Sequence, residues 1–99
     1  LPGTPSRSSA GRTPSAPAAE LDGSALDLFE ALRRHRLEIA RSEGVPPYVV
    51  ASDRTLRDIA LMRPRSRPEL ELAHGIGPAK AEKYGDGFLV VIARVCPPT

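Results

Sequence analysis

A glycine-containing turn, Gly-Ile-Gly-Pro-Ala-Lys-Ala, carries the clearest chemical potential in the sequence. Gly75 and Gly77 can adopt positive φ where one helix ends, and Ile76 between them can anchor the turn in a core. The next helix then presents free amides at its N-terminus, where the helix dipole favours an anion such as a phosphate. Lys80 and Lys83 add positive charge nearby. A purely structural turn between packed helices is the alternative, and the sequence leaves both open.

The segment Val-Pro-Pro-Tyr-Val-Val at 45–50 places an aromatic ring on stiff backbone. Its two consecutive prolines fix φ and push Val45 toward extended geometry, so we expect an ordered connection here and not a helix. We expect the three valines to be buried. An exposed Tyr48 ring held in this way would stack on a nucleic-acid base with little loss of entropy. The alternative is a half-buried tyrosine that covers the edge of the core.

Arginines form the third group of candidate residues. Arg54 and Arg57 lie three residues apart, as do Arg33 and Arg36, so each pair shares one face of a predicted helix. Guanidinium groups in such positions can contact phosphates. Acidic residues interleave with them, which makes surface ion pairs the expected fate of several.

Catalytic and metal-binding chemistry finds little support. His35 and His74 lie far apart in the sequence, and the carboxylates are scattered singly. The serines and threonines lack a base and an orienting group at a recognisable spacing, and the sequence contains no phosphate-loop or dinucleotide motif. A single cysteine, Cys96, excludes a disulfide framework and indicates a reducing compartment. We therefore expect a non-catalytic chain that binds neither a cofactor nor a metal.

Composition divides the chain at about residue 21. Residues 1–21 are rich in proline, serine and alanine, which cannot bury enough apolar surface to offset the entropy of ordering, so we expect a flexible linker. Residues 22–97 are expected to form one small domain of a larger protein. The formal net charge of the whole chain is only +2, so any basic surface must be local. The sequence shows no signal peptide and no apolar stretch of membrane-spanning length.

Hydrophobic periodicity predicts an all-α bundle of five helices, at 26–43, 52–64, 66–75, 78–85 and 87–95. Ser24 and Gly44 are the expected caps of the first helix. Ser66 and Glu69 have the spacing of a capping box. The β-branched segment near the C-terminus has no second strand to pair with, so we expect a helix there as well.

These segments, taken in order, resemble the HRDC domain, the helicase-and-RNase-D C-terminal module. The matching segments are 32–40, 45–50, 55–60, 67–70, 75–85 and the apolar last helix. The resemblance implies a compact five-helix fold with a helix-hairpin-helix-like element. It also implies an accessory nucleic-acid-binding role, most like that in a bacterial RecQ DNA helicase with functions in DNA repair and recombination. An RNase D-type nuclease is an alternative parent.

The resemblance further implies that Tyr48 contacts single-stranded or junction DNA weakly, with Arg54, Arg57 and Lys80 as additional contacts. ATP hydrolysis and its divalent metal would belong to other domains of the parent. A monomer in the bacterial cytoplasm, associated with the nucleoid, is expected.

Two features favour a different role, that of a regulatory module docking on the helicase core or on a partner protein. One is the balanced charge of the domain, and the other is Leu37, which stands where the family often has a polar residue. His35 is a further departure from the family, which usually has an apolar residue there.

Overall fold

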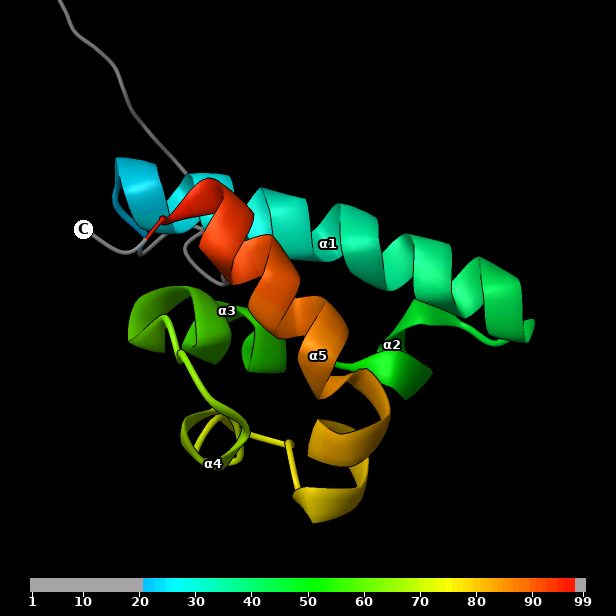
Figure 1. The fold of residues 1–99 in the computed structure, drawn as a ribbon. Helices are drawn as coiled ribbons and strands as arrows, with labels where there is room; N and C mark the ends of the chain where they lie inside the picture. Colours follow the sequence, from blue (N-terminus) through cyan, green and yellow to red (C-terminus); the bar gives the residue numbers. More distant parts are fainter. Residues whose placement is uncertain (1–20, 98–99) are drawn as a thin grey trace, which may run out of the picture.

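The computed structural model describes residues 21–97, which form five helices and no strand (Figure 1). The helices are α1 (Gly23–Glu43), α2 (Pro47–Val50), α3 (Asp53–Met62), α4 (Arg67–Leu70) and α5 (Pro78–Val95). Helix α1 packs against α2, α3 and α5, and α4 packs against α5. The prediction of an all-α bundle is confirmed. Of the predicted linker, residues 1–20 lie outside the described residues.

The C-terminal helix differs from its prediction. Where the sequence predicts two helices, α5 runs unbroken from Pro78 to Val95 through Gly85 and Gly87. A glycine inside a helix is destabilising by roughly 0.5–1 kcal/mol relative to alanine, and packing compensates for it here. A Cβ at Gly85 would lie 3.4 Å from Leu70 Cδ2, so α4 packs directly against α5 at this glycine.

The Pro-Pro-Tyr segment also differs, because it contains the short helix α2. Pro46 is extended and is the N-cap, and Pro47 takes the first helical position. Proline suits that position because its φ is already helical and its missing N–H has no partner there. The expected extended geometry therefore holds before residue 47, and the prediction of a non-helical connection is wrong after it. Val50 is buried as expected, whereas Val49 is exposed.

The helix caps are partly those expected. Asp22 caps α1 in place of Ser24, because its Oδ1 accepts from the Ala25 N–H at 2.9 Å. Gly44 ends α1 with φ of 69°, as predicted. Ser66 caps α4, but the Glu69 carboxylate accepts from the Arg65 N–H at 2.7 Å. The reciprocal half of the capping box is thus shifted by one residue.

The core is built from the inward faces of α1, α3 and α5. Its largest fully buried apolar side chains include Leu28, Leu32, Leu56, Ile59, Leu70, Phe88 and Ile92. Ile76 is buried with them and anchors the turn before α5, as predicted.

His35 faces α5 from α1. Its ring meets Phe88 edge-on, with centroids 5.6 Å apart. A Cβ at Gly87 would lie 2.7 Å from His35 Nε2, so the imidazole occupies the space that the glycine leaves open. Nε2 is buried and has no hydrogen-bond partner within residues 21–97. Burial lowers the pKa of His35, the charge of Glu38 raises it and the charge of Arg94 lowers it.

This burial predicts a pH dependence of stability. The unfolded chain binds a proton on His35 near its ordinary pKa of 6.5, whereas the folded domain favours the neutral ring. The free energy of unfolding should therefore be highest above that pH and should fall as pH drops through the unfolded pKa toward the lower folded one. Urea unfolding between pH 5.5 and 7.5 measures it. His35→Leu should flatten the profile; an unchanged slope in this variant would contradict the prediction.

Candidate nucleic-acid interface

Tyr48 projects from α2 into solvent. Its side chain is 71% exposed, while Val50 at the end of the same helix is fully buried and anchors it. The structure therefore excludes the alternative of a half-buried Tyr48 that covers the edge of the core. A phenol ring on a short, anchored helix is available for stacking with little further loss of conformational freedom.

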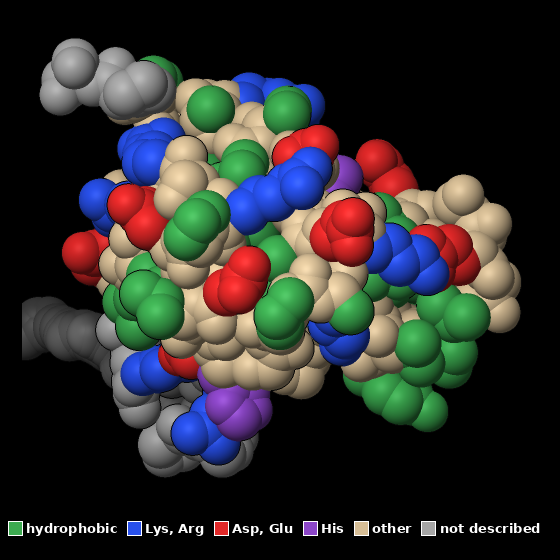
Figure 2. Space-filling model, turned by 60° about the horizontal axis from the view of Figure 1, so that its bottom comes forward, with side chains coloured by type: hydrophobic (Ala, Val, Ile, Leu, Met, Phe, Trp, Pro, Cys, Tyr) green, Lys and Arg blue, Asp and Glu red, His purple; other side chains and the backbone are tan. Residues whose placement is uncertain are grey.

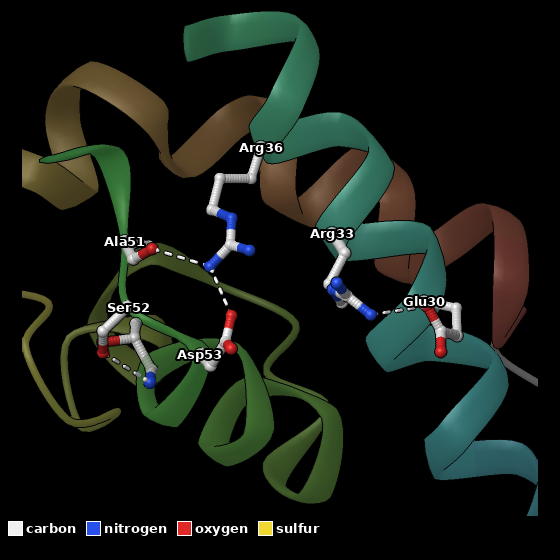
Figure 3. A network of polar contacts seen from close by, with 7 residues as sticks. Glu30, Arg33, Arg36, Ala51, Ser52 and Asp53 are labelled. Carbon is white, nitrogen blue, oxygen red and sulfur yellow. Dashed lines mark hydrogen bonds and ion pairs between the residues drawn. The ribbon is translucent and has the colours of Figure 1, made fainter. Parts of the chain in front are cut away.

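Arg36 holds the junction between α2 and α3 onto α1 (Figure 3). Its Nη1 donates to the Ala51 carbonyl oxygen at 3.0 Å and to Asp53 Oδ1 at 2.8 Å. The residue is only 9% exposed. The spacing of the arginines groups Arg36 with Arg33 as phosphate contacts or as members of ion pairs, and for Arg36 the structure shows an ion pair, because its guanidinium binds Asp53 within the domain.

The other side of this junction receives the glycine turn. Ser52 caps α3, and its Oγ accepts from the Thr55 N–H at 3.1 Å. Thr55 is buried, and a Cβ at Gly75 would lie 2.8 Å from its Oγ1. The His74 N–H donates to Asp58 Oδ2 at 3.0 Å. The start of α3 is thus held by α1 on one side and by the turn on the other.

The two arginines predicted on α3 differ in their surroundings. Arg54 is exposed in the first turn of the helix, whereas Arg57 is half-buried. The Arg57 Nη1 lies 3.7 Å from Asp58 Oδ1, so part of its charge is balanced locally. Arg54 is consequently the better placed of the two for a phosphate.

Only one of the two glycines needs to be glycine. Gly75 has φ of 79°, in the left-handed region. Gly77 has φ of −96° and is the N-cap of α5, so the expectation of positive φ is wrong for it. No side chain of the described residues caps α5, which leaves first-turn amides open beside the half-buried Lys80. This arrangement suits a phosphate.

Lys83 is engaged within the domain. Its Nζ lies 3.5 Å from Glu43 Oε1 and 5.2 Å from the centre of the Tyr84 ring. The Tyr84 hydroxyl donates to the same carboxylate oxygen at 2.9 Å. Hydrogen bonding to Tyr84 and the charge of Glu43 raise the pKa of Lys83. Lys83 therefore ties α5 to the end of α1 and is less available to a ligand than the sequence suggests.

A groove of about 370 Å³ lies beside α2 and was not anticipated from the sequence. Its lining, which we call the α1–α2 groove, consists of Glu30, Arg33, Arg34, Arg36, Leu37 and Pro47. The only sequence signal is the cluster of arginines on one helix. The packing of α2 against that helix, which makes the groove, has no local signature.

Charge on the surface is mixed. On the face shown in Figure 2, basic and acidic side chains are interspersed and do not gather by sign. Hydrophobic side chains gather on the right-hand side of that view, the side on which α2 lies in Figure 1. Any attraction for nucleic acid must therefore come from local groups.

No group of three or more His, Cys, Asp or Glu side chains is arranged to hold a metal ion in the part of the chain that the structure describes. Within residues 21–97, no helix combines the length and apolar character that crossing a membrane requires.

Known proteins resemble this chain in sequence and in fold. The ATP-dependent DNA helicase RecQ of Bacillus subtilis is 48% identical over 63 residues, which is 64% of this chain and 11% of that protein. RecQ of Haemophilus influenzae is 41% identical over 66 residues, 67% of this chain and 11% of that protein. The ATP-dependent DNA helicase UvrD2 of Mycobacterium tuberculosis is 37% identical over 75 residues, 76% of this chain and 10% of the relative. The chain thus spans about a tenth of the length of these curated relatives.

A solved structure and a family model agree with these relatives. The D. radiodurans RecQ HRDC domain 3 matches with a TM-score of 0.72 and 34% identity, covering 77% of this chain and 100% of that one. The model of the HRDC domain family matches residues 25–92. The match begins in the first turn of α1 and ends in the last turns of α5, so it takes in all five helices. On both sequence and fold, this chain belongs to the HRDC domain family.

Proposed function

We propose that this domain is an accessory nucleic-acid-binding module of a RecQ-type DNA helicase, which contacts single-stranded or junction DNA weakly and tunes the substrate choice of the helicase. The observation that carries the proposal is the Tyr48 ring, 71% exposed on a helix that Val50 anchors in the core. The similarity to two bacterial RecQ helicases supports the choice of parent. ATP and its divalent metal would bind elsewhere in that parent, and this domain would need no cofactor.

In this proposal the ring of Tyr48 stacks on one base, and basic groups contact phosphates. Stacking is worth about 1–3 kcal/mol per base and tolerates any sequence. Arg54 and the open amides of α5 beside Lys80 are candidate phosphate contacts, and Gly75 and Gly77 shape the turn that presents those amides. Arg57 and Lys83 contribute less because Asp58 and Glu43 already balance them. The balanced charge keeps affinity low and sensitive to salt.

Tyr48→Ala tests the proposal. The expected result is about a tenfold loss of affinity for a fluorescent oligothymidine at low salt, or roughly 1.4 kcal/mol. Tyr48→Trp should retain binding because it keeps an aromatic face. Leu72→Ala is the matched control, since Leu72 is also an exposed large apolar side chain, at 77%. Fluorescence anisotropy with the 99-residue chain measures all four proteins.

The proposal fails if the unaltered chain shows no DNA-dependent change in its amide chemical shifts at low salt. It fails equally if Tyr48→Ala and Leu72→Ala bind DNA alike. A titration with single-stranded and junction DNA in parallel also identifies the preferred structure.

A second candidate is a regulatory module that docks on the helicase core of its parent and binds DNA little. The interspersed charges in Figure 2 favour it, as does the exposure of Leu37 and Val49 near α2. Under this alternative, deleting the domain changes unwinding by the parent although the isolated domain does not bind DNA. Unchanged unwinding after deletion would count against it.

The identity of the parent belongs to the proposal as well. The match to UvrD2 covers more of this chain than the RecQ matches do, at lower identity. A UvrD2-like helicase is therefore a second possible parent, and an RNase D-type nuclease a third. We propose that the domain acts as a monomer in the bacterial cytoplasm, at the nucleoid.

A further inference from the structure

We propose that a single strand bound at Tyr48 continues along α1, with its phosphates in the α1–α2 groove on Arg33 and Arg34. The inference rests on the proposed DNA-binding function and adds the path of the strand. The groove reaches the residue before Tyr48, because Pro47 is both the first residue of α2 and part of the groove lining.

The charge of the groove suits a phosphate backbone. Three arginines and one glutamate line it. The glutamate, Glu30, pairs with Arg33 at 3.4 Å, and both side chains are about half exposed. An exposed ion pair of this kind contributes little to stability, so a phosphate can replace the carboxylate with little loss. Arg34 is exposed and has no ion-pair partner among residues 21–97.

Arg36 adds charge to the groove without leaving its own partners. Its Nη1 stays on Ala51 and Asp53, so the wall between α1 and α2 is already formed before a strand arrives. A preformed site loses less entropy on binding than one that must be ordered. Arg36 is therefore a positioning residue in this proposal, and Arg33 and Arg34 are the contacts.

The arrangement and the apolar part of the groove fit a strand. Arg33 and Arg34 both line the groove, so the two proposed contacts face the same space. Leu37 and Pro47 offer an apolar surface to the sugars. In this path the exposed Leu37 contacts the sugars of the strand, while Tyr48 stacks on a base.

The glycine turn is the competing path, and its geometry favours it less. Lys83 is held by Glu43 and Tyr84, and Lys80 is half-buried. The turn itself docks on α3 through Thr55 and Asp58. The turn thus offers the half-buried Lys80, whereas the α1–α2 groove offers two exposed arginines, Arg33 and Arg34.

The test compares two double variants of equal charge in the 99-residue chain. Arg33→Gln with Arg34→Gln removes the proposed contacts. Arg41→Gln with Arg94→Gln removes two exposed arginines outside the α1–α2 groove. Affinity for a fluorescent oligothymidine is measured from 20 to 200 mM salt. The first variant should bind several-fold more weakly, and the slope of log K against log salt should shrink by about 1.4, at about 0.7 per lost phosphate contact.

The remaining outcomes distinguish the proposed strand path along α1 from the proposed DNA-binding function. Equal slopes for the two double variants overturn the path, while a loss of affinity in Tyr48→Ala in the same assay leaves the proposed function standing. A smaller slope in Lys80→Gln, with none in the Arg33 and Arg34 variant, moves the strand to the glycine turn and also overturns the path. If the unaltered chain binds no DNA, path and function fail together. Urea unfolding of each variant excludes a loss of fold as the cause.

Discussion

Replacing Arg36 with alanine is expected to destabilise the domain by about 3 kcal/mol. Most of the effect comes from the Ala51 carbonyl oxygen, which is buried and accepts its hydrogen bond from Arg36 at 3.0 Å. A buried acceptor left without a partner costs about 1–3 kcal/mol. Loss of the buried aliphatic stem of Arg36 adds roughly 1–2 kcal/mol. Asp53 contributes less, because its side chain is half exposed and water replaces the lost partner.

Two further substitutions of Arg36 separate the contribution of its hydrogen bonds from that of its apolar stem. Arg36→Met keeps the apolar volume and loses the hydrogen bonds, so its free energy of unfolding should lie between those of the alanine variant and the original protein. Arg36→Lys should recover part of the difference, since both bonds come from a single nitrogen, Nη1, and the lysine ammonium carries three donors. Urea unfolding measures all three variants. An alanine variant within about 0.5 kcal/mol of the original would show that the contact is dispensable.

Loss of the Arg36 contact at the α2–α3 junction should also affect the proposed DNA-binding site at Tyr48. Ala51 and Asp53 follow α2 directly, so a domain without the Arg36 contact should hold Tyr48 less firmly. In Arg36→Met, the rate of amide hydrogen exchange should increase more at residues 48–53 than in α5. Uniform faster exchange across the domain would instead indicate a purely global loss of stability.

Gly75→Ala is expected to destabilise the domain by about 2 kcal/mol or more. An L-residue in the left-handed region costs roughly 1–2 kcal/mol, and Gly75 has φ of 79°. The new Cβ would also lie 2.8 Å from Thr55 Oγ1. Thr55 cannot move away easily, because it is buried and its hydroxyl lies 3.0 Å from Ser52 Oγ. Urea or thermal unfolding measures the loss.

The same turn supplies the control. Gly77 has φ of −96°, and a Cβ there would meet no atom within 4 Å. Gly77→Ala should therefore cost well under the Gly75 variant, about the few tenths to one kcal/mol of losing a good N-cap. Combining Gly75→Ala with Thr55→Ala should recover part of the loss, since the clashing oxygen is gone. Equal losses at the two glycines would contradict this account of the turn.

Local patterns predicted much of this domain. The amphipathic spacing of α1 and α3 and the glycine that ends α1 appear where the sequence places them. These features depend on residues within four positions of one another, which is the range over which helix propensity and capping act. The Pro-Pro-Tyr segment and the glycine turn were recognisable for the same reason, and they carried the resemblance to the HRDC family.

The two errors have different causes. Gly85 and Gly87 indicate a break when seen locally, but α5 continues because α4 and His35 pack beside them, and this packing outweighs a local preference of about 1 kcal/mol. Proline at 46 and 47 indicates a connection, yet the second proline starts α2 because proline suits the first helical position.

For the candidate site, the sequence alone determined which chemical groups are available: an aromatic on stiff backbone, a glycine turn before a helix, and arginines on two helices. Only the tertiary structure decided which of these groups remain available to a ligand. Arg36 is engaged within the domain because it donates a hydrogen bond to a carbonyl oxygen fifteen residues away. Lys83 is engaged because it pairs with a carboxylate forty residues earlier in the chain. A side chain can be freed or engaged only by what packs beside it, and that depends on contacts between distant segments which no local pattern encodes.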